Sequence, residues 1–90
     1  MDDIKKNTEM SFGLFITTLM MEALISLGDL ENPVTKKKEM NIEHARVMID
    51  TLEMLQGKTK GNLDKDEEQA LGSMLYDLRM RFVAKSNKKE

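Results

Sequence analysis

The sequence contains no cysteine and no tryptophan, and it has one histidine and one proline among its 90 residues. Without cysteine, the chain can form neither a disulfide nor a thiolate metal site, and it offers no thiol nucleophile. One histidine is little material for a metal site, and without tryptophan few rings remain on which nucleic-acid bases could stack. The composition therefore points away from thiol and histidine-metal chemistry.

Charge of neither sign is in large excess. The 14 Lys and Arg residues are set against 16 Asp and Glu residues, for a formal net charge of -2. This near balance argues against a general binder of polyanions, although it is compatible with a local basic patch. Apolar residues make up 40% of the chain and charged residues 33%, which is typical of one folded soluble domain.

The longest apolar stretch, residues 12–27, is too short to span a membrane and contains Glu22. Lys5 and Lys6 before it resemble the start of a secretory signal. However, acidic neighbours dilute this basic end, and no small-residue cleavage site follows. We therefore expect a cytoplasmic protein without membrane contact.

Capping residues predict where the first helix lies. Ser11 is a favourable N-cap and Gly28 can close a helix in the left-handed conformation, so we expect a helix between them. The connector over residues 28–41 is long for a helical bundle. Asn32 and Pro33 are a turn signal within it. Its flanks could pair as a short hairpin, and an irregular loop is the other interpretation.

Two further helices are expected after the connector. Asn41 is a good N-cap for a helix that runs to about residue 60. Asp64 and Glu67 have the spacing of a capping box, in which each side chain binds a free amide at the helix start. The third helix should therefore cover about residues 65–84.

These boundaries predict an all-α, three-helix unit. We expect a flexible arm over residues 1–10, a single helical domain over residues 11–84 and a polar tail over residues 85–90.

At about 100° per residue, the second and third helices each have one apolar side that should be buried. On the second helix that side comprises Ile42, Ala45, Met48, Ile49, Leu52 and Leu55, and Val47 and Met54 lie outside it. On the third helix it comprises Leu71, Met74, Leu75, Leu78 and Phe82, and on roughly the opposite side lie Tyr76, Met80 and Val83.

The first helix is apolar on nearly all sides. Its one continuous polar strip consists of Thr18, Glu22 and Ser26. One apolar side carries Phe12, Ile16, Leu19, Ala23 and Leu27, and another carries Leu14, Met21 and Ile25. Because two partner helices can cover only about two sides of it, we expect a third side to be left in water.

The surplus apolar side chains are expected to drive self-association. Burial of a large apolar side chain is worth roughly 1.5–3 kcal/mol, so six of them give about 9–18 kcal/mol per protomer. Association costs an estimated 4–15 kcal/mol. If the six form one patch, the balance favours a homodimer or larger homo-oligomer with the first helix near the axis. The predicted interface with a second copy, or with another protein, is Leu14, Met21, Ile25, Tyr76, Met80 and Val83.

The pattern of charges predicts one ion pair along a helix and leaves a second one, across the bundle, open. Asp77 and Arg81 are four residues apart in the favourable acid-first order. Glu22 on so apolar a helix needs a polar partner or water, and Arg79 is a candidate partner across the bundle.

Two groups of lysines are candidate contacts for an anion or RNA. Lys36, Lys37 and Lys38 lie in the connector, and Lys58 and Lys60 lie at the end of the second helix. A plainer interpretation makes the first group a solvated charge run. In the same interpretation, the second group completes a helix end, where cations are favoured.

Short sequence runs carry a family resemblance. They are ALISLG at 23–28, NPVT at 32–35, IDTL at 49–52, KTKGNL at 58–63 and LYDLRMRFV at 75–83. Together they resemble a bacterial family known only as domain of unknown function 1844, over about residues 12–83. This family carries no established activity. The resemblance therefore implies a small bacterial cytosolic protein and transfers no catalytic residue.

No motif indicates catalysis. The sequence has no phosphate-binding glycine loop, serine elbow or zinc-ligand spacing, and His44 has no companion ligands at helical spacing. We therefore expect neither an enzyme nor a cofactor. The leading hypothesis is a non-enzymatic, self-associating helical module for protein interaction. The alternative is an RNA- or ribosome-associated accessory protein that uses its lysines.

Overall fold

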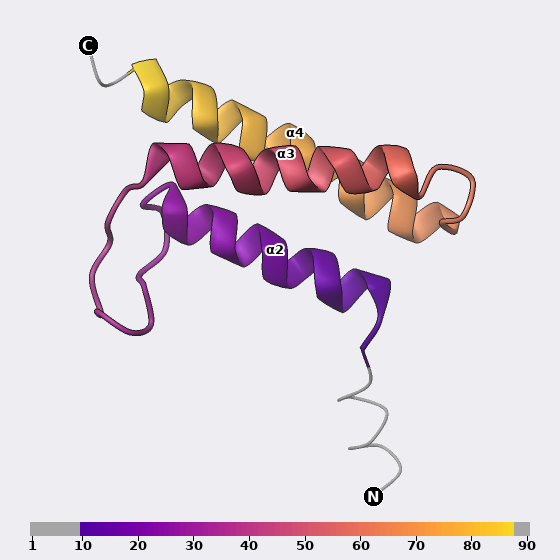
Figure 1. Cartoon of the computed structure of the whole chain (residues 1–90), viewed down its shortest axis with the longest axis horizontal. Helices are drawn as coiled ribbons and strands as arrows, with labels where there is room; N and C mark the ends of the chain where they lie inside the picture. Colours follow the sequence, from indigo (N-terminus) through magenta and orange to yellow (C-terminus); the bar gives the residue numbers. More distant parts are fainter. Residues whose placement is uncertain (1–9, 88–90) are drawn as a thin grey trace, which may run out of the picture.

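The computed structural model describes residues 10–87, which form three helices around one core (Figure 1). Helix α2 spans Phe12–Ser26, α3 spans Ile42–Lys58 and α4 spans Lys65–Asn87. Because the described residues contain no strand, the all-α prediction is confirmed for them. The arm expected over residues 1–10 lies outside the described residues except for Met10.

Helix α2 begins and ends at the predicted capping residues. The Ser11 hydroxyl accepts a hydrogen bond from the amide of Leu14 at 3.1 Å. At the other end, Gly28 has a φ of 83° and its amide donates to the carbonyl of Ile25 at 3.0 Å. The left-handed glycine turns the chain away from the helix axis and so starts the connector.

The connector forms a loop, so the hairpin interpretation is wrong. The Asn32 carboxamide accepts hydrogen bonds from the amides of Val34 at 2.8 Å and Thr35 at 3.4 Å. Lys36 then takes a positive φ of 63°. These local bonds wind the chain into a tight turn, and the described residues on either side of it form no strand.

Helix α3 begins as predicted and ends slightly early. The Asn41 side chain accepts a hydrogen bond from the amide of His44 at 3.1 Å, which confirms the N-cap. The helix stops at Lys58, about two residues before the predicted end. There the Thr59 hydroxyl donates to the carbonyl of Leu55 at 2.6 Å, and Gly61 has a φ of 87°.

The capping box at the start of α4 is confirmed. The Asp64 carboxylate accepts from the amide of Glu67 at 2.8 Å, and the Glu67 carboxylate accepts from the amide of Asp64 at 3.0 Å. Two of the free amides at this helix end are therefore satisfied by side chains.

Helix α4 extends further than predicted, so part of the expected polar tail is helical. The helix continues to Asn87, and Lys85 binds Asp29 with an N–O distance of 2.8 Å. This contact with a residue far away in the sequence holds the last turn of the helix against the rest of the fold. Residues 88–90 lie outside the described residues.

The three helices share one core, and α2 and α4 both run antiparallel to α3 (Figure 1). All buried side chains of α3 and α4 belong to the predicted sides of those helices. The core comprises Ile16, Ala23, Leu27, Ala45, Met48, Ile49, Leu52, Leu71, Leu75 and Leu78. None of these helices in the described part of the chain combines the length and apolar content needed to cross a membrane.

Two glycines should respond to alanine in opposite directions. Gly28→Ala is expected to lower the free energy of unfolding by about 1–2 kcal/mol, because a side chain is strained at positive φ. The new Cβ would make only an ordinary van der Waals contact, 3.5 Å from the Cβ of Met40, so the strain lies in the backbone. Gly72→Ala lies inside α4, where a Cβ meets nothing within 4 Å, and should raise the same quantity by about 1 kcal/mol. Urea unfolding of both variants checks this, and shifts of equal sign would contradict it.

Candidate interaction surfaces

The side of α2 that faces away from the core is exposed and mostly apolar, and Glu22 lies at its edge. We call the α2 strip the residues Leu14, Thr18, Met21 and Ile25. Leu14 is 40% exposed and Met21 is 50% exposed, whereas Ile25 is half-buried. The opposite side of the same helix carries Ile16 and Ala23, which are fully buried. The sequence therefore correctly predicted which side of α2 faces the core. It also correctly predicted that Leu14 and Met21 on another side would be exposed.

The threonine hydroxyls on this side of α2 are already hydrogen-bonded. Thr18 donates to the carbonyl of Phe15 at 2.6 Å, and Thr17 donates to the carbonyl of Gly13 at 2.7 Å. Because both donors are satisfied within the helix, covering them with another apolar surface would leave no hydroxyl hydrogen unpaired.

The one charged residue of α2 is directed toward α3. Glu22 lies 3.2 Å from the Nε2 atom of His44, where the two form a partly exposed pair. The candidate pairing of Glu22 with Arg79 is wrong, because Arg79 binds Glu53 on α3 at 2.9 Å. Glu22 and Arg79 lie on the flanks of α2 and α4 that face α3, and α3 provides a partner for each.

The three predicted interface residues of α4 form a second, separate surface. We call Tyr76, Met80 and Val83 the α4 strip; they are 69%, 58% and 56% exposed. Val83 lines a hollow between α3 and α4, whereas Met21 and Ile25 line hollows beside α3 and the connector. Because each strip lies opposite the common core on its own helix, the six residues form two patches of three.

Other exposed apolar residues accompany the two strips. Val47 and Met54 on the outer side of α3 are 57% and 50% exposed, as their helical angles indicated. Phe15 was missed, although it is 40% exposed beside Leu14. Its helical angle falls between the core side of α2 and Glu22, so periodicity alone could have identified it as a residue on the flank.

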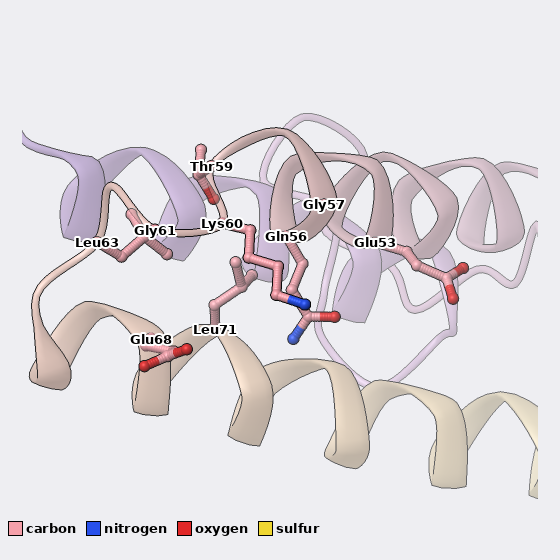
Figure 2. Close-up of a pocket in the computed structure, with 9 residues that line it drawn as sticks. All are labelled: Glu53, Gln56, Gly57, Thr59, Lys60, Gly61, Leu63, Glu68 and Leu71. Atoms are coloured by element: carbon pink, nitrogen blue, oxygen red, sulfur yellow. The ribbon is translucent and has the colours of Figure 1, made fainter.

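The candidate anion site at the end of α3 has a mixed charge. A hollow of about 410 Å³ lies here between α3, the following turn and α4. Figure 2 shows Lys60 and Gln56 extending into its middle, with Glu53 at one end and Glu68 at the other. Lys58 is exposed and does not line the hollow. Lys60 is the only cationic residue among those that line this hollow, and Glu53 and Glu68 line it too, so its charge does not favour an anion.

The two groups of lysines lie at opposite ends of α3. Lys36, Lys37 and Lys38 are exposed in the connector that precedes the helix, and Lys58 and Lys60 lie at its far end (Figure 1). A helix of this length separates its ends by about 25 Å. The structure therefore does not bring the five predicted lysines together into one basic patch.

An ionic cluster ties the beginning of the connector to the end of α4. Asp29 binds Arg81 at 3.0 Å and Lys85 at 2.8 Å, and Arg81 also binds Asp77 at 3.0 Å. The predicted pair of Asp77 and Arg81 is thereby confirmed. Partial burial raises the pKa of Asp29, but the hydrogen bonds from Lys85 and Arg81 outweigh it and lower the pKa below its ordinary 3.8.

The chain is a small all-α domain whose helices carry apolar side chains on their outer sides. Within residues 10–87, no group of three or more His, Cys, Asp or Glu side chains is placed to hold a metal ion. The chain belongs to the family described as Domain of unknown function (DUF1844), whose model matches residues 9–84. This match confirms the resemblance read from the sequence. No curated protein and no solved structure matches the chain.

Removing the charge of Asp29 should destabilise the fold in a pH-dependent way. Asp29→Asn is expected to lower the free energy of unfolding at neutral pH by about 1 kcal/mol, because Arg81 and Lys85 lose an anionic partner. Since folding depresses the pKa of Asp29, its contribution is present above the unfolded-state value of 3.8 and is lost as the pH falls through the folded-state value.

Urea unfolding at neutral pH and at about pH 2 checks this expectation. The matched control is Asp50→Asn, since Asp50 is an exposed carboxylate on α3 that has no ion pair within residues 10–87. The control should leave the stability unchanged. Equal stability of Asp29→Asn and the parent protein at neutral pH would contradict a stabilising role for the cluster.

Proposed function

We propose that this protein is a non-enzymatic helical module that associates with itself and docks another protein through its outer apolar sides. The observation that carries the proposal is the exposed apolar side of α2, on which Leu14 and Met21 remain 40% and 50% exposed. A helix that is apolar on all sides is normally enclosed on all sides. In this chain α3 and α4 cover only part of α2. A second copy of the chain would cover the side that they leave exposed.

The chemistry of the two strips suggests that the α2 strip serves self-association and that the α4 strip binds a partner protein. The members of the α2 strip are uncharged and its one hydroxyl, that of Thr18, donates within the helix, which suits an apolar contact between copies. The α4 strip includes the exposed Tyr76, whose ring and hydroxyl together suit a mixed apolar and polar contact with another protein. The absence of cysteine is consistent with the cytoplasm, since small secreted domains are commonly held by disulfides.

The solution mass tests self-association. Sedimentation equilibrium at micromolar concentration should give at least twice the 10.3 kDa mass of one chain. The dissociation should be weakly salt-dependent, because the α2 strip is uncharged. A stable monomer of 10.3 kDa at this concentration would remove the proposal.

A charge placed on α2 should separate the copies. Met21→Asp is expected to weaken self-association at least about 100-fold, because an uncompensated charge would have to be buried in the contact. The matched control is Val34→Asp, since Val34 is 86% exposed but lies at the turn of the connector. Sedimentation of both variants measures the effect. Equal dissociation of the two variants would point to a general effect of charge.

RNA association through the lysines is the weaker candidate function. It is favoured only by the exposure of Lys36, Lys37 and Lys38, and their distance from Lys58 and Lys60 argues against one phosphate-binding surface. Binding with about six phosphate contacts would weaken roughly 10³-fold between about 50 and 200 mM salt. We expect no RNA retention at the lower salt, as measured by filter binding, and steeply salt-dependent retention would favour this function instead.

A further inference from the structure

We propose that Met40, Met54 and Met80 are sites of reversible oxidation to methionine sulfoxide, and that the fold tolerates this modification. The fold tolerates it because the buried core contains a single thioether, that of Met48. The inference goes beyond the proposed function, since it concerns side chains that are accessible in one copy of the chain. The agent is a peroxide, which oxidises a thioether by two electrons.

Methionine is both frequent in this chain and unusually exposed. The chain has nine methionines among its 90 residues, although methionine is ordinarily one of the residue types most often fully buried. Within residues 10–87 only Met48 is buried, at 7% exposure, and Met20 and Met74 are partly buried. The exposed methionines are Met10, Met21, Met40, Met54 and Met80. The surface therefore displays thioethers that are not needed to fill the core.

The three proposed sites lie on different parts of the fold and outside the α2 strip. Met40 lies in the connector, Met54 on the outer side of α3 and Met80 on the outer side of α4; they are 48%, 50% and 58% exposed. The chain has no cysteine, whose thiolate would otherwise compete for the oxidant. A peroxide that meets the folded chain therefore reacts first with exposed thioethers.

The modification transfers one oxygen atom to sulfur. A lone pair of the sulfur attacks one oxygen of hydrogen peroxide, and an S–O bond forms as the O–O bond breaks. The second oxygen leaves as hydroxide and takes up the proton of the first, which gives water. The sulfur is thereby oxidised by two electrons and the peroxide is reduced. Methionine sulfoxide reductases return the thioether and release water, with two electrons and two protons from a dithiol.

Oxidation at these sites changes the surface and leaves the core as it is. A sulfoxide oxygen is polar, and at an exposed position water can hydrate it. Apart from Met48, the core cluster consists of Ile, Leu and Ala side chains, which peroxide does not oxidise. Met80 is the only methionine of the α4 strip, so its oxidation makes that strip more polar. The weaker docking of a partner that follows from this rests on the proposed function.

Peroxide treatment of the full chain, followed by peptide mass mapping, tests the sites. Met40, Met54 and Met80 should each gain one oxygen at least about tenfold faster than Met48, because peroxide reaches Met48 only when the core opens. Met48 and Met54 lie on the same helix at 7% and 50% exposure, so they compare a protected thioether with an accessible one. Far-UV circular dichroism should stay unchanged during the fast phase.

Retention on a hydrophobic column measures the change of the surface. It should fall on oxidation and return after treatment with sulfoxide reductases and dithiothreitol. A triple variant, Met40→Leu with Met54→Leu and Met80→Leu, keeps the apolar volume without the thioethers. It should keep at least about half of the retention that the parent protein loses. The matched control is Met48→Leu, which should lose as much retention as the parent protein.

Three outcomes would overturn the inference. Oxidation of Met48 at the rate of Met54, or loss of helical signal during the fast phase, would mean that oxidation acts through unfolding. An equal loss of retention in the triple variant and the parent protein would assign the change to other methionines. The inference and the proposed function can fail separately. A parent protein that sediments as a monomer removes self-association, but Met40, Met54 and Met80 are exposed on that monomer.

Discussion

The structure depends on the need to cover a helix that is apolar on nearly every side. In α2 the only charged residue is Glu22, and it binds His44 on α3. The polar groups that remain on its outer side, the Thr17 and Thr18 hydroxyls, bind back to the backbone. Helices α3 and α4 cover the side that carries Ile16 and Ala23, and the cluster at Asp29 holds the far end of α2 against the last turns of α4. The first two of these features give Glu22, Thr17 and Thr18 a hydrogen-bond partner within the fold itself.

The features that could be predicted from the sequence depend on residues only a few positions apart. Ser11, Asn41 and the pair of Asp64 and Glu67 cap their helices as expected, because a cap bonds within three residues. The buried sides of α3 and α4 follow from helical spacing in the same way. Contacts between residues that are far apart in the sequence could not be predicted from such spacing. The end of α4 is held by Asp29, 56 residues before Lys85, and no local pattern signals such a contact.

For the candidate surfaces too, the exposure of single residues could be predicted from the sequence, but their arrangement in the fold could not. Helical angles correctly indicated that Leu14, Met21, Tyr76, Met80 and Val83 would be exposed. Whether they form one surface depends on how the helices are arranged around the core, which periodicity does not contain. The assignment of Arg79 failed for the same reason. Its partner depends on which flank of α4 faces α3, and Glu53 on α3 occupies that position. The hairpin failed because the carboxamide and the carbonyl of Asn32 accept hydrogen bonds from the amides of Val34 and Lys36, and these close a turn that strand propensity does not describe.

Two separate strips differ from one continuous patch in how much apolar surface would remain for a partner after self-association. With all six side chains in one interface, self-association would consume the exposed apolar surface and leave none for a partner. With the α2 strip and the α4 strip on different sides of the core, a dimer formed through α2 still displays Tyr76, Met80 and Val83 on each copy. A two-fold dimer would therefore present the α4 strip twice, and a partner with two matching sites would bind by both, with a large gain in effective concentration. In that arrangement self-association increases the affinity for a partner while leaving the partner's binding surface open.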